Sequence, residues 1–175
     1  MSDIAEQLEI RLFSSEDSVS ELTELVNRAY RQLGDMGLKY VGTWQGDEIT
    51  LKRIADAECY VGLLDGRLAA TILLGSPGSK RGPGWYSRDD VAVFGQFGVE
   101  PELQGKGIGT LMLRRIEDRA RLMGAAELAL DTAEPATHLI EWYTRRGYRF
   151  IEHVQWSVTN YRSVIMSKTL RPEDE

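Results

Sequence analysis

Residues 104–110, with the sequence Gln-Gly-Lys-Gly-Ile-Gly-Thr, form the most informative segment of the chain. They lead directly into residues 108–123, whose apolar spacing is typical of a helix. A glycine-rich turn at a helix start exposes several backbone N–H groups in one direction, and the helix dipole adds partial positive charge there. Glycines also let a phosphate approach the backbone without meeting a Cβ atom. The segment therefore predicts a binding site for a phosphorylated ligand.

Two common phosphate-binding patterns do not match this segment. The dinucleotide fingerprint G-x-G-x-x-G fails because Thr110 stands where its last glycine would be, counted from Gly105. The P-loop pattern G-x-x-x-x-G-K-S/T fails because Glu100 stands where its first glycine would be. From the spacing alone, a plain turn between a strand and a helix remains the alternative to a ligand site.

Residue types that hold metals or act as nucleophiles are sparse. His138 and His153 are the only histidines, Cys59 is the only cysteine, and none has metal-ligand spacing with another. We therefore expect no metal site. Cys59 lies in an apolar stretch, which favours a core position over a nucleophile, and a single cysteine allows no internal disulfide.

The composition is that of an ordinary soluble globular protein. The chain has 175 residues, of which 42% are hydrophobic and 27% charged, and we expect residues 1–175 to form one domain. No apolar run reaches the roughly 20 residues that a membrane span needs, and residues 1–10 lack the apolar core of a signal peptide. A cytoplasmic location without membrane contact is expected. The net charge of -6 argues against nucleic acid as a partner, because phosphate binding needs a basic surface.

Apolar periodicity and turn residues divide the rest of the chain into strands and helices. Strands are expected at residues 8–13, 60–64, 68–74, 91–99, 127–131, 149–158 and 162–170, and helices at 18–30, 47–57, 108–123 and 135–146. Asp65-Gly66 predicts a hairpin, and residues 91–131 predict two parallel strands joined by a right-handed crossover. These elements indicate a mixed α/β (α+β) fold, with a central, mostly antiparallel sheet of about seven strands and about four flanking helices.

Two blocks of this sequence resemble the GNAT superfamily of N-acetyltransferases. Residues 99–101 (Val-Glu-Pro) and 104–109 (Gln-Gly-Lys-Gly-Ile-Gly) resemble its motif A, a strand ending in Val-x-Pro followed by Q/R-x-x-G-x-G/A. Residues 128–132 (Leu-Ala-Leu-Asp-Thr) and 139–148 (Leu-Ile-Glu-Trp-Tyr-Thr-Arg-Arg-Gly-Tyr) resemble its motif B. The blocks lie in the family's order and together span about residues 91–150, whereas residues 1–90 match only in general layout.

The resemblance implies a GNAT-like fold that binds acetyl-CoA as acyl donor. The pantetheine arm would lie along the bent strand at residues 97–99, and backbone amides of residues 104–110 would bind the pyrophosphate. The implied cofactor-binding residues are Phe97, Gly98, Val99, Gln104, Gly105, Lys106, Gly107, Ile108, Gly109, Thr110 and Tyr143. Gly98 would suit a bulge or a close backbone approach, and the side chains of Phe97 and Val99 can pack in the core at the same time.

Tyr143 is the catalytic residue that the resemblance implies. Its counterpart in the family lies near the CoA sulfur and donates a proton to the departing thiolate. A phenol has a reference pKa of about 10, so it keeps its proton at pH 7 and can protonate a thiolate. A purely structural role in the core is the alternative.

The general base is open. Some relatives carry a glutamate where this chain has Val93, which cannot accept a proton. Nearby carboxylates are Asp89, Asp90, Asp131 and Glu134, and we single out none of them. Ala136 stands where many relatives have an asparagine that contacts CoA, so one such contact is lost.

The expected activity is direct transfer of an acetyl group from acetyl-CoA to a primary amine in a ternary complex. The acceptor can be a small molecule or a protein amine, and it would enter beside the first two helices, where Tyr30, Tyr40 and Trp44 either line the site or pack in the core. A non-catalytic acyl-CoA sensor is the alternative, and a nucleotide-binding module is disfavoured by the failed patterns. The sequence leaves open the acceptor's identity, acyl groups other than acetyl, and the oligomeric state, a homodimer included.

Overall fold

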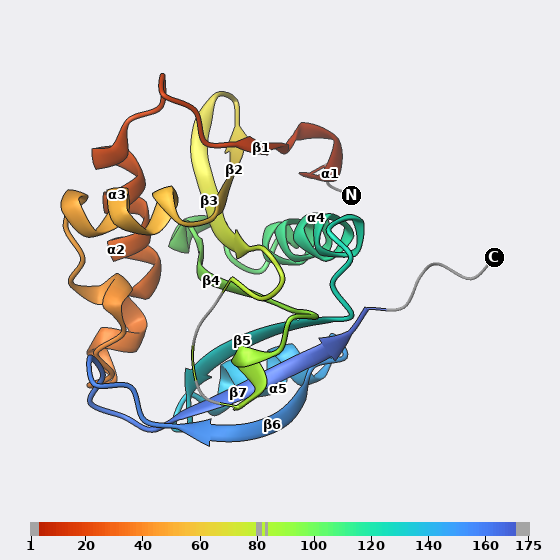
Figure 1. The fold of residues 1–175 in the computed structure, drawn as a ribbon. Coiled ribbons are helices and arrows are strands. Elements are labelled where there is room, and N and C mark those ends of the chain that lie inside the picture. Colours follow the sequence, from red (N-terminus) through yellow and green to blue (C-terminus); the bar gives the residue numbers. More distant parts are fainter. Residues whose placement is uncertain (1–3, 80–81, 83, 171–175) are drawn as a thin grey trace.

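The computed structural model describes residues 4–79, 82 and 84–170, and its centre is a seven-stranded sheet in the order β1-β2-β3-β4-β5-β7-β6 (Figure 1). The strands are β1 (Glu9–Leu12), β2 (Glu58–Leu64), β3 (Arg67–Gly75), β4 (Val91–Val99), β5 (Glu127–Ala133), β6 (Arg149–Val154) and β7 (Ser163–Thr169). In this sheet β4 and β5 run parallel, and the other neighbouring pairs are antiparallel. The mixed, mostly antiparallel sheet predicted from the sequence is therefore confirmed.

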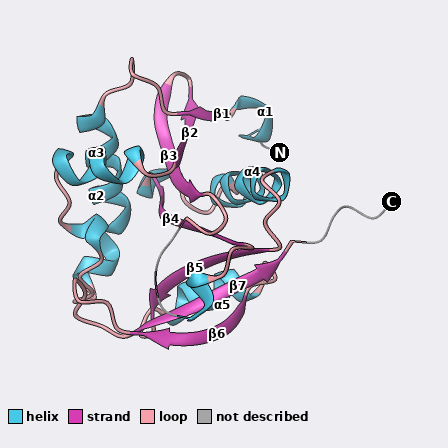
Figure 2. Cartoon of the chain, viewed as in Figure 1, coloured by secondary structure: helices cyan, strands magenta, loops and turns pink. Residues whose placement is uncertain are grey.

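Helices cover both faces of the sheet (Figure 2). They are α1 (Ile4–Gln7), α2 (Val19–Asp35), α3 (Asp47–Ala55), α4 (Ile108–Leu122) and α5 (Thr137–Thr144). Leu22 of α2 packs with Val61 of β2 on one face, whereas Met112 of α4 packs in the main core with the neighbouring Tyr60 on the other. This division follows from the two-residue period of a strand, which sends successive side chains to opposite faces.

The predicted strands and helices are present, with some shifted ends. The hairpin forms as expected, since Asp65 (φ 50°) and Gly66 (φ 76°) both adopt the left-handed conformation of a two-residue turn. α2 runs beyond residue 30 to Asp35, and Gly37 (φ 84°) ends it. β6 stops at Val154 instead of residue 158, because the chain then forms a loop before β7. Among the described residues no helix is both long and apolar enough to cross a membrane.

β4 and β5 pair over only a short stretch and then separate. Their register covers Val91 to Val93 on β4, after which β4 continues beside β3 and β5 continues beside β7. β4 bends at this point, because Gly95 and Gly98 pair with Leu73 and Thr71, so that two residues of β4 face one of β3. The sheet therefore opens between its two central strands.

α2 lies close against the far end of β4. A Cβ atom added to Gly98 would lie 2.7 Å from the Cβ of Ala29, so a glycine is required for this approach. Arg28 of α2 also holds the carboxylate of Glu100, directly after β4, through two hydrogen bonds of 2.8 and 2.9 Å. The bulge lies at the preceding residues and not at Gly98, where the close neighbour is Ala29 of α2.

We expect Gly98→Ala to lower the free energy of unfolding by about 1 to 3 kcal/mol, because the new methyl group overlaps Ala29 and α2 must shift. Urea denaturation would measure this change. Gly34→Ala is the control on the same helix: its Cβ would lie 3.4 Å from Cγ2 of Thr43, an ordinary contact, so stability should be retained or slightly increased. Equal stability of the two variants would contradict the tight packing of α2 on β4.

Candidate active site

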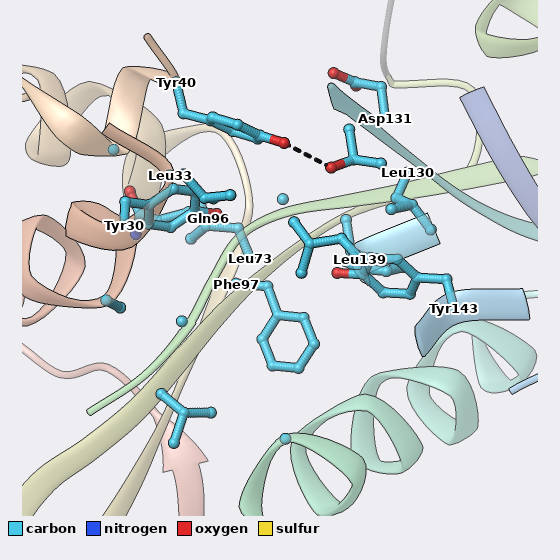
Figure 3. Close-up of a pocket in the computed structure, with 18 of the residues that line it drawn as sticks. Tyr30, Leu33, Tyr40, Leu73, Gln96, Phe97, Leu130, Asp131, Leu139 and Tyr143 are labelled. Carbon is cyan, nitrogen blue, oxygen red and sulfur yellow. Dashed lines mark hydrogen bonds between the residues drawn. The ribbon is translucent and has the colours of Figure 1, made fainter. Parts of the chain in front are cut away.

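A single pocket of about 1190 Å³ occupies the opening between β4 and β5 (Figure 3). Its walls come from α2, the split strands, α5, the glycine-rich loop before α4 and the loop before β7. Residues of the glycine-rich loop line one part of it, and aromatic side chains of α2, of the loop after α2 and of the loop before β7 line another. The pocket therefore connects the predicted phosphate site with the sheet face that α2 and α3 cover.

The glycine-rich loop has the backbone geometry of an anion site. Gly105 (φ 79°) and Gly107 (φ 89°) are both left-handed, and Cβ atoms added to them would meet nothing within 4 Å. Gly107 is the N-cap of α4 and provides no side-chain hydrogen bond to the amides of the first turn. These amides are consequently available to a ligand at the positive end of the helix dipole.

All of the predicted cofactor-binding residues except Lys106 line the pocket. Phe97 follows the bulge residue Gln96, whose φ of 45° is unusual for a residue other than glycine. The Phe97 ring packs against Trp142 of α5 with 5.9 Å between ring centroids. The bulge therefore turns this part of β4 toward the cavity.

Tyr143 of α5 lines the pocket, and its ring is held among other aromatic side chains. Its ring packs against Phe94, Trp142 and Tyr148, at centroid distances of 6.0, 5.1 and 5.8 Å. Among the described residues no group forms a hydrogen bond with the hydroxyl, which points into the pocket (Figure 3). Burial raises the pKa of Tyr143 well above its usual value, so the phenol stays protonated.

Arg146 is a pocket residue that the sequence analysis missed. Its guanidinium stacks on Trp142 at 3.5 Å from the ring centroid and donates a 3.0 Å hydrogen bond to Oγ1 of Thr110 in the loop. The i,i+4 spacing of Trp142 and Arg146 could have predicted this stacking, because residues so spaced lie on the same side of a helical turn. Arg146 places a positive charge beside the predicted phosphate site.

The four candidate carboxylates lie in different surroundings. Asp131 lines the pocket, where it accepts hydrogen bonds from the hydroxyl of Tyr86 (2.7 Å) and from Nε1 of Trp156 (3.0 Å). Asp90 instead pairs with an arginine, Glu134 pairs with an arginine and a histidine, and Asp89 is an exposed turn residue. Of the four, Asp131 alone faces the cavity.

The three aromatic residues predicted near the acceptor differ in whether they line the pocket. Tyr30 and Tyr40 line the pocket, whereas Trp44 is half exposed outside it. The hydroxyl of Tyr40 shares a 2.8 Å hydrogen bond with Thr132 of β5, and its ring packs at 4.9 Å from that of Tyr161 (Figure 3). These contacts join the loop after α2 to β5 and to the loop before β7.

Cys59 takes no part in this pocket. It lies in a buried cluster with Leu22 and Val61 under α2, and burial raises the pKa of its thiol to about 11. A thiol with this pKa stays protonated and is a poor nucleophile. The predicted core position of Cys59 is confirmed.

Comparison with known proteins agrees with this architecture. Residues 19–148 match the model of the family described as Acetyltransferase (GNAT) family. The chain is 35% identical over 135 residues to the S-(2-succino)cysteine N-acetyltransferase of Bacillus subtilis (strain 168), covering 76% of this chain and 79% of that protein. It is 28% identical over 169 residues to the S-alkylcysteine N-acetyltransferase of the same organism, covering 93% and 89%.

Solved structures share the fold at low sequence identity. Ard1 from Thermoplasma volcanium has a TM-score of 0.73 at 14% identity, over 95% of this chain and 99% of that chain. A GNAT family acetyltransferase from Elizabethkingia anophelis, crystallised with acetyl-CoA bound, has a TM-score of 0.67 at 13% identity, over 94% and 99%. Both curated relatives are named as enzymes, which favours catalysis over the sensor alternative. The chain belongs to the GNAT family and is an acetyl-CoA-dependent N-acetyltransferase.

Proposed function

We propose that the acceptor is a free S-substituted cysteine, whose α-amine attacks the thioester of acetyl-CoA directly. The observation that carries this proposal is the similarity to two enzymes named for acetylation of S-substituted cysteines, one of them over nearly the whole chain. The undivided pocket supports direct attack, because donor and acceptor can meet in it without a covalent enzyme intermediate. A small-molecule acceptor also agrees with the cysteine derivatives for which both relatives are named.

The donor would lie along the loop and the bulged strand. Backbone amides of Gly105 to Thr110 would bind the pyrophosphate, and the open left-handed conformation of Gly107 supports this assignment. The backbone of Phe97 to Val99 would accompany the pantetheine arm, since β4 has no strand partner on that side beyond its bulge. Arg146 would add positive charge near the phosphates.

Tyr143 would act as the general acid. As the neutral amine attacks the carbonyl carbon, the C–N bond forms and the C–S bond breaks, and the departing sulfur takes the phenolic proton. The proton lost by the nitrogen returns to the tyrosinate through solvent. The unpaired hydroxyl and the raised pKa of Tyr143 support this role, because the group is protonated and its donor is not engaged elsewhere.

Acetyl-CoA should raise the melting temperature, while ATP and NAD at the same concentration should not. At 100 times its Kd, acetyl-CoA would add about 2.7 kcal/mol of stability. Gly107→Ala should lose most of this effect, because the methyl group enters the phosphate-binding face. Gly124→Ala is the matched control, since Gly124 (φ 85°) is equally left-handed but lies at the other end of α4. A similar loss of acetyl-CoA affinity in both variants would count against the loop.

Tyr143→Phe should lower kcat about 100-fold or more while changing the Kd of acetyl-CoA little, because only the proton donor is removed. Thiol release and calorimetric titration would measure the two quantities. Tyr148→Phe is the control: this neighbouring hydroxyl is buried without a hydrogen-bond partner among the described residues, so its removal should leave kcat near the wild-type value. Wild-type turnover by Tyr143→Phe would eliminate the acid role.

A panel of acceptors would test the proposed substrate. We expect kcat/KM for S-methylcysteine, S-benzylcysteine or S-(2-succino)cysteine to exceed that for lysine, spermidine and a short peptide at least 10-fold, an effect of about 1.4 kcal/mol. Thiol release at saturating acetyl-CoA gives the ranking. A preference for the polyamine or the peptide would refute the proposed acceptor and leave the family assignment intact.

A further inference from the structure

The acceptor side of the pocket contains two opposite charges that form no ion pair. Arg53 on α3 and Asp131 on β5 both line the cavity, and among the described residues neither pairs with a charged side chain, including each other. We propose that Arg53 binds the α-carboxylate and Asp131 the α-ammonium of a free amino acid, which makes this a zwitterion site. The inference rests on the proposed function and specifies which part of the acceptor is recognised.

Arg53 is a half-buried guanidinium with free donors. Its Nη1 donates a 2.8 Å hydrogen bond to Oε1 of Gln45, and no other described group bonds to it. Nη2 lies against β4, since a Cβ added to Gly95 would be 3.7 Å from it. Burial lowers the pKa of Arg53, and the charges of Tyr30 and Asp131 act in the opposite direction. A guanidinium offers paired donors that match the two oxygens of a carboxylate.

Gln45 holds Arg53 in place through a buried amide network. Its Nε2 donates to Oγ1 of Thr50 at 2.8 Å and to Oε1 of Gln96 at 3.0 Å, so its own Oε1 is directed at Arg53. Gln96 is 2% exposed, and its Nε2 has no acceptor among the described residues. Buried donors without partners are rare in proteins. The bulge of β4 therefore carries a second unmatched donor beside the guanidinium.

Asp131 is held firmly by neutral donors. The hydroxyl of Tyr86 and the indole of Trp156 each donate to one of its oxygens, which fixes the plane of the carboxylate without cancelling its charge. A carboxylate has about four acceptor positions, so two remain for a ligand. Figure 3 shows Asp131 on β5 across the opening from Tyr30 and Gln96, which come from α2 and β4. A substrate ammonium is the complementary group, and it would release one proton to solvent before its nitrogen attacks.

An amino acid carries both charges on one carbon and therefore fits this arrangement. Unpaired charges in a partly dehydrated pocket are costly, and a ligand of opposite polarity relieves both at once. A peptide N-terminus or a polyamine has no α-carboxylate, so it would leave Arg53 unpaired. Sites that bind a charged group reject analogues lacking it far more strongly than apolar sites do. The pair would select free amino acids from the amines of the cell.

The test compares S-methylcysteine with its primary amide, which keeps the thioether and the α-amine but lacks the carboxylate. We expect wild-type kcat/KM to be about 10- to 100-fold higher for the acid than for the amide. Arg53→Met should lower kcat/KM for the acid and so bring this ratio close to one. Arg53→Lys should give a ratio between those of Arg53→Met and the wild type. Asp131→Asn should lower both values by a similar factor and leave the ratio unchanged, because both compounds carry the ammonium.

Lys52→Met is the matched control, because it removes a positive charge from the same helix outside the pocket, where Lys52 pairs with Glu48 at 3.6 Å. It should leave the ratio unchanged, and unchanged acetyl-CoA affinity would show that each variant is folded. A wild-type ratio near one, or a ratio that survives Arg53→Met, overturns this inference while the proposed acceptor stands. Turnover of neither compound, with turnover of amines unrelated to cysteine, refutes the proposed acceptor itself.

Discussion

The separation of β4 and β5 is the constraint on which the rest of the structure depends. Two parallel strands that part after three residues leave backbone groups without strand partners in the middle of a sheet. Such groups need other partners, because an unpaired backbone N–H or C=O in the interior is costly. Here β4 bulges at Gln96, α2 closes on Gly98, and α5 fills one side of the gap with Trp142 and Tyr143. The active-site pocket is what remains between these adjustments.

The two halves of the pocket would recognise their proposed ligands by different means. In the proposed assignment the donor is bound by main-chain amides beside left-handed glycines, so its binding would be independent of most side chains there. The acceptor would be bound by single side chains from separate elements, among them Arg53 on α3 and Asp131 on β5, which both line the pocket. Substitutions at Arg53 or Asp131 would then change the acceptor and leave donor binding intact.

The sequence predicted the fold and the glycine-rich loop because both depend on local patterns. Glycine spacing before an amphipathic helix identifies an anion site, and apolar alternation identifies strands, so the seven strands and the loop were found with small errors at their ends. The acceptor half depends on contacts distant in sequence, such as that between Gln45 and Gln96, which no spacing reveals. Asp131 could be named only as one carboxylate among four, since nothing in the sequence shows that Tyr86 and Trp156 converge on it. The extension of α2 past residue 30 was not predicted, because Gly34 lies inside the helix while only Gly37, with its left-handed φ of 84°, ends it.

The described pocket is continuous from the glycine-rich loop to the acceptor side, and this affects how tightly an inhibitor can bind. A molecule that joins CoA to the amine of the acceptor through an acetyl bridge would occupy both halves as a single body. It would lose translational and rotational freedom once, whereas two separate substrates each lose their own. The contacts of the loop and those of the Arg53 and Asp131 region would then contribute to one dissociation constant. Such a conjugate should therefore have a much lower Kd than either substrate has alone. Its selectivity among GNAT enzymes would come from the part that mimics the acceptor.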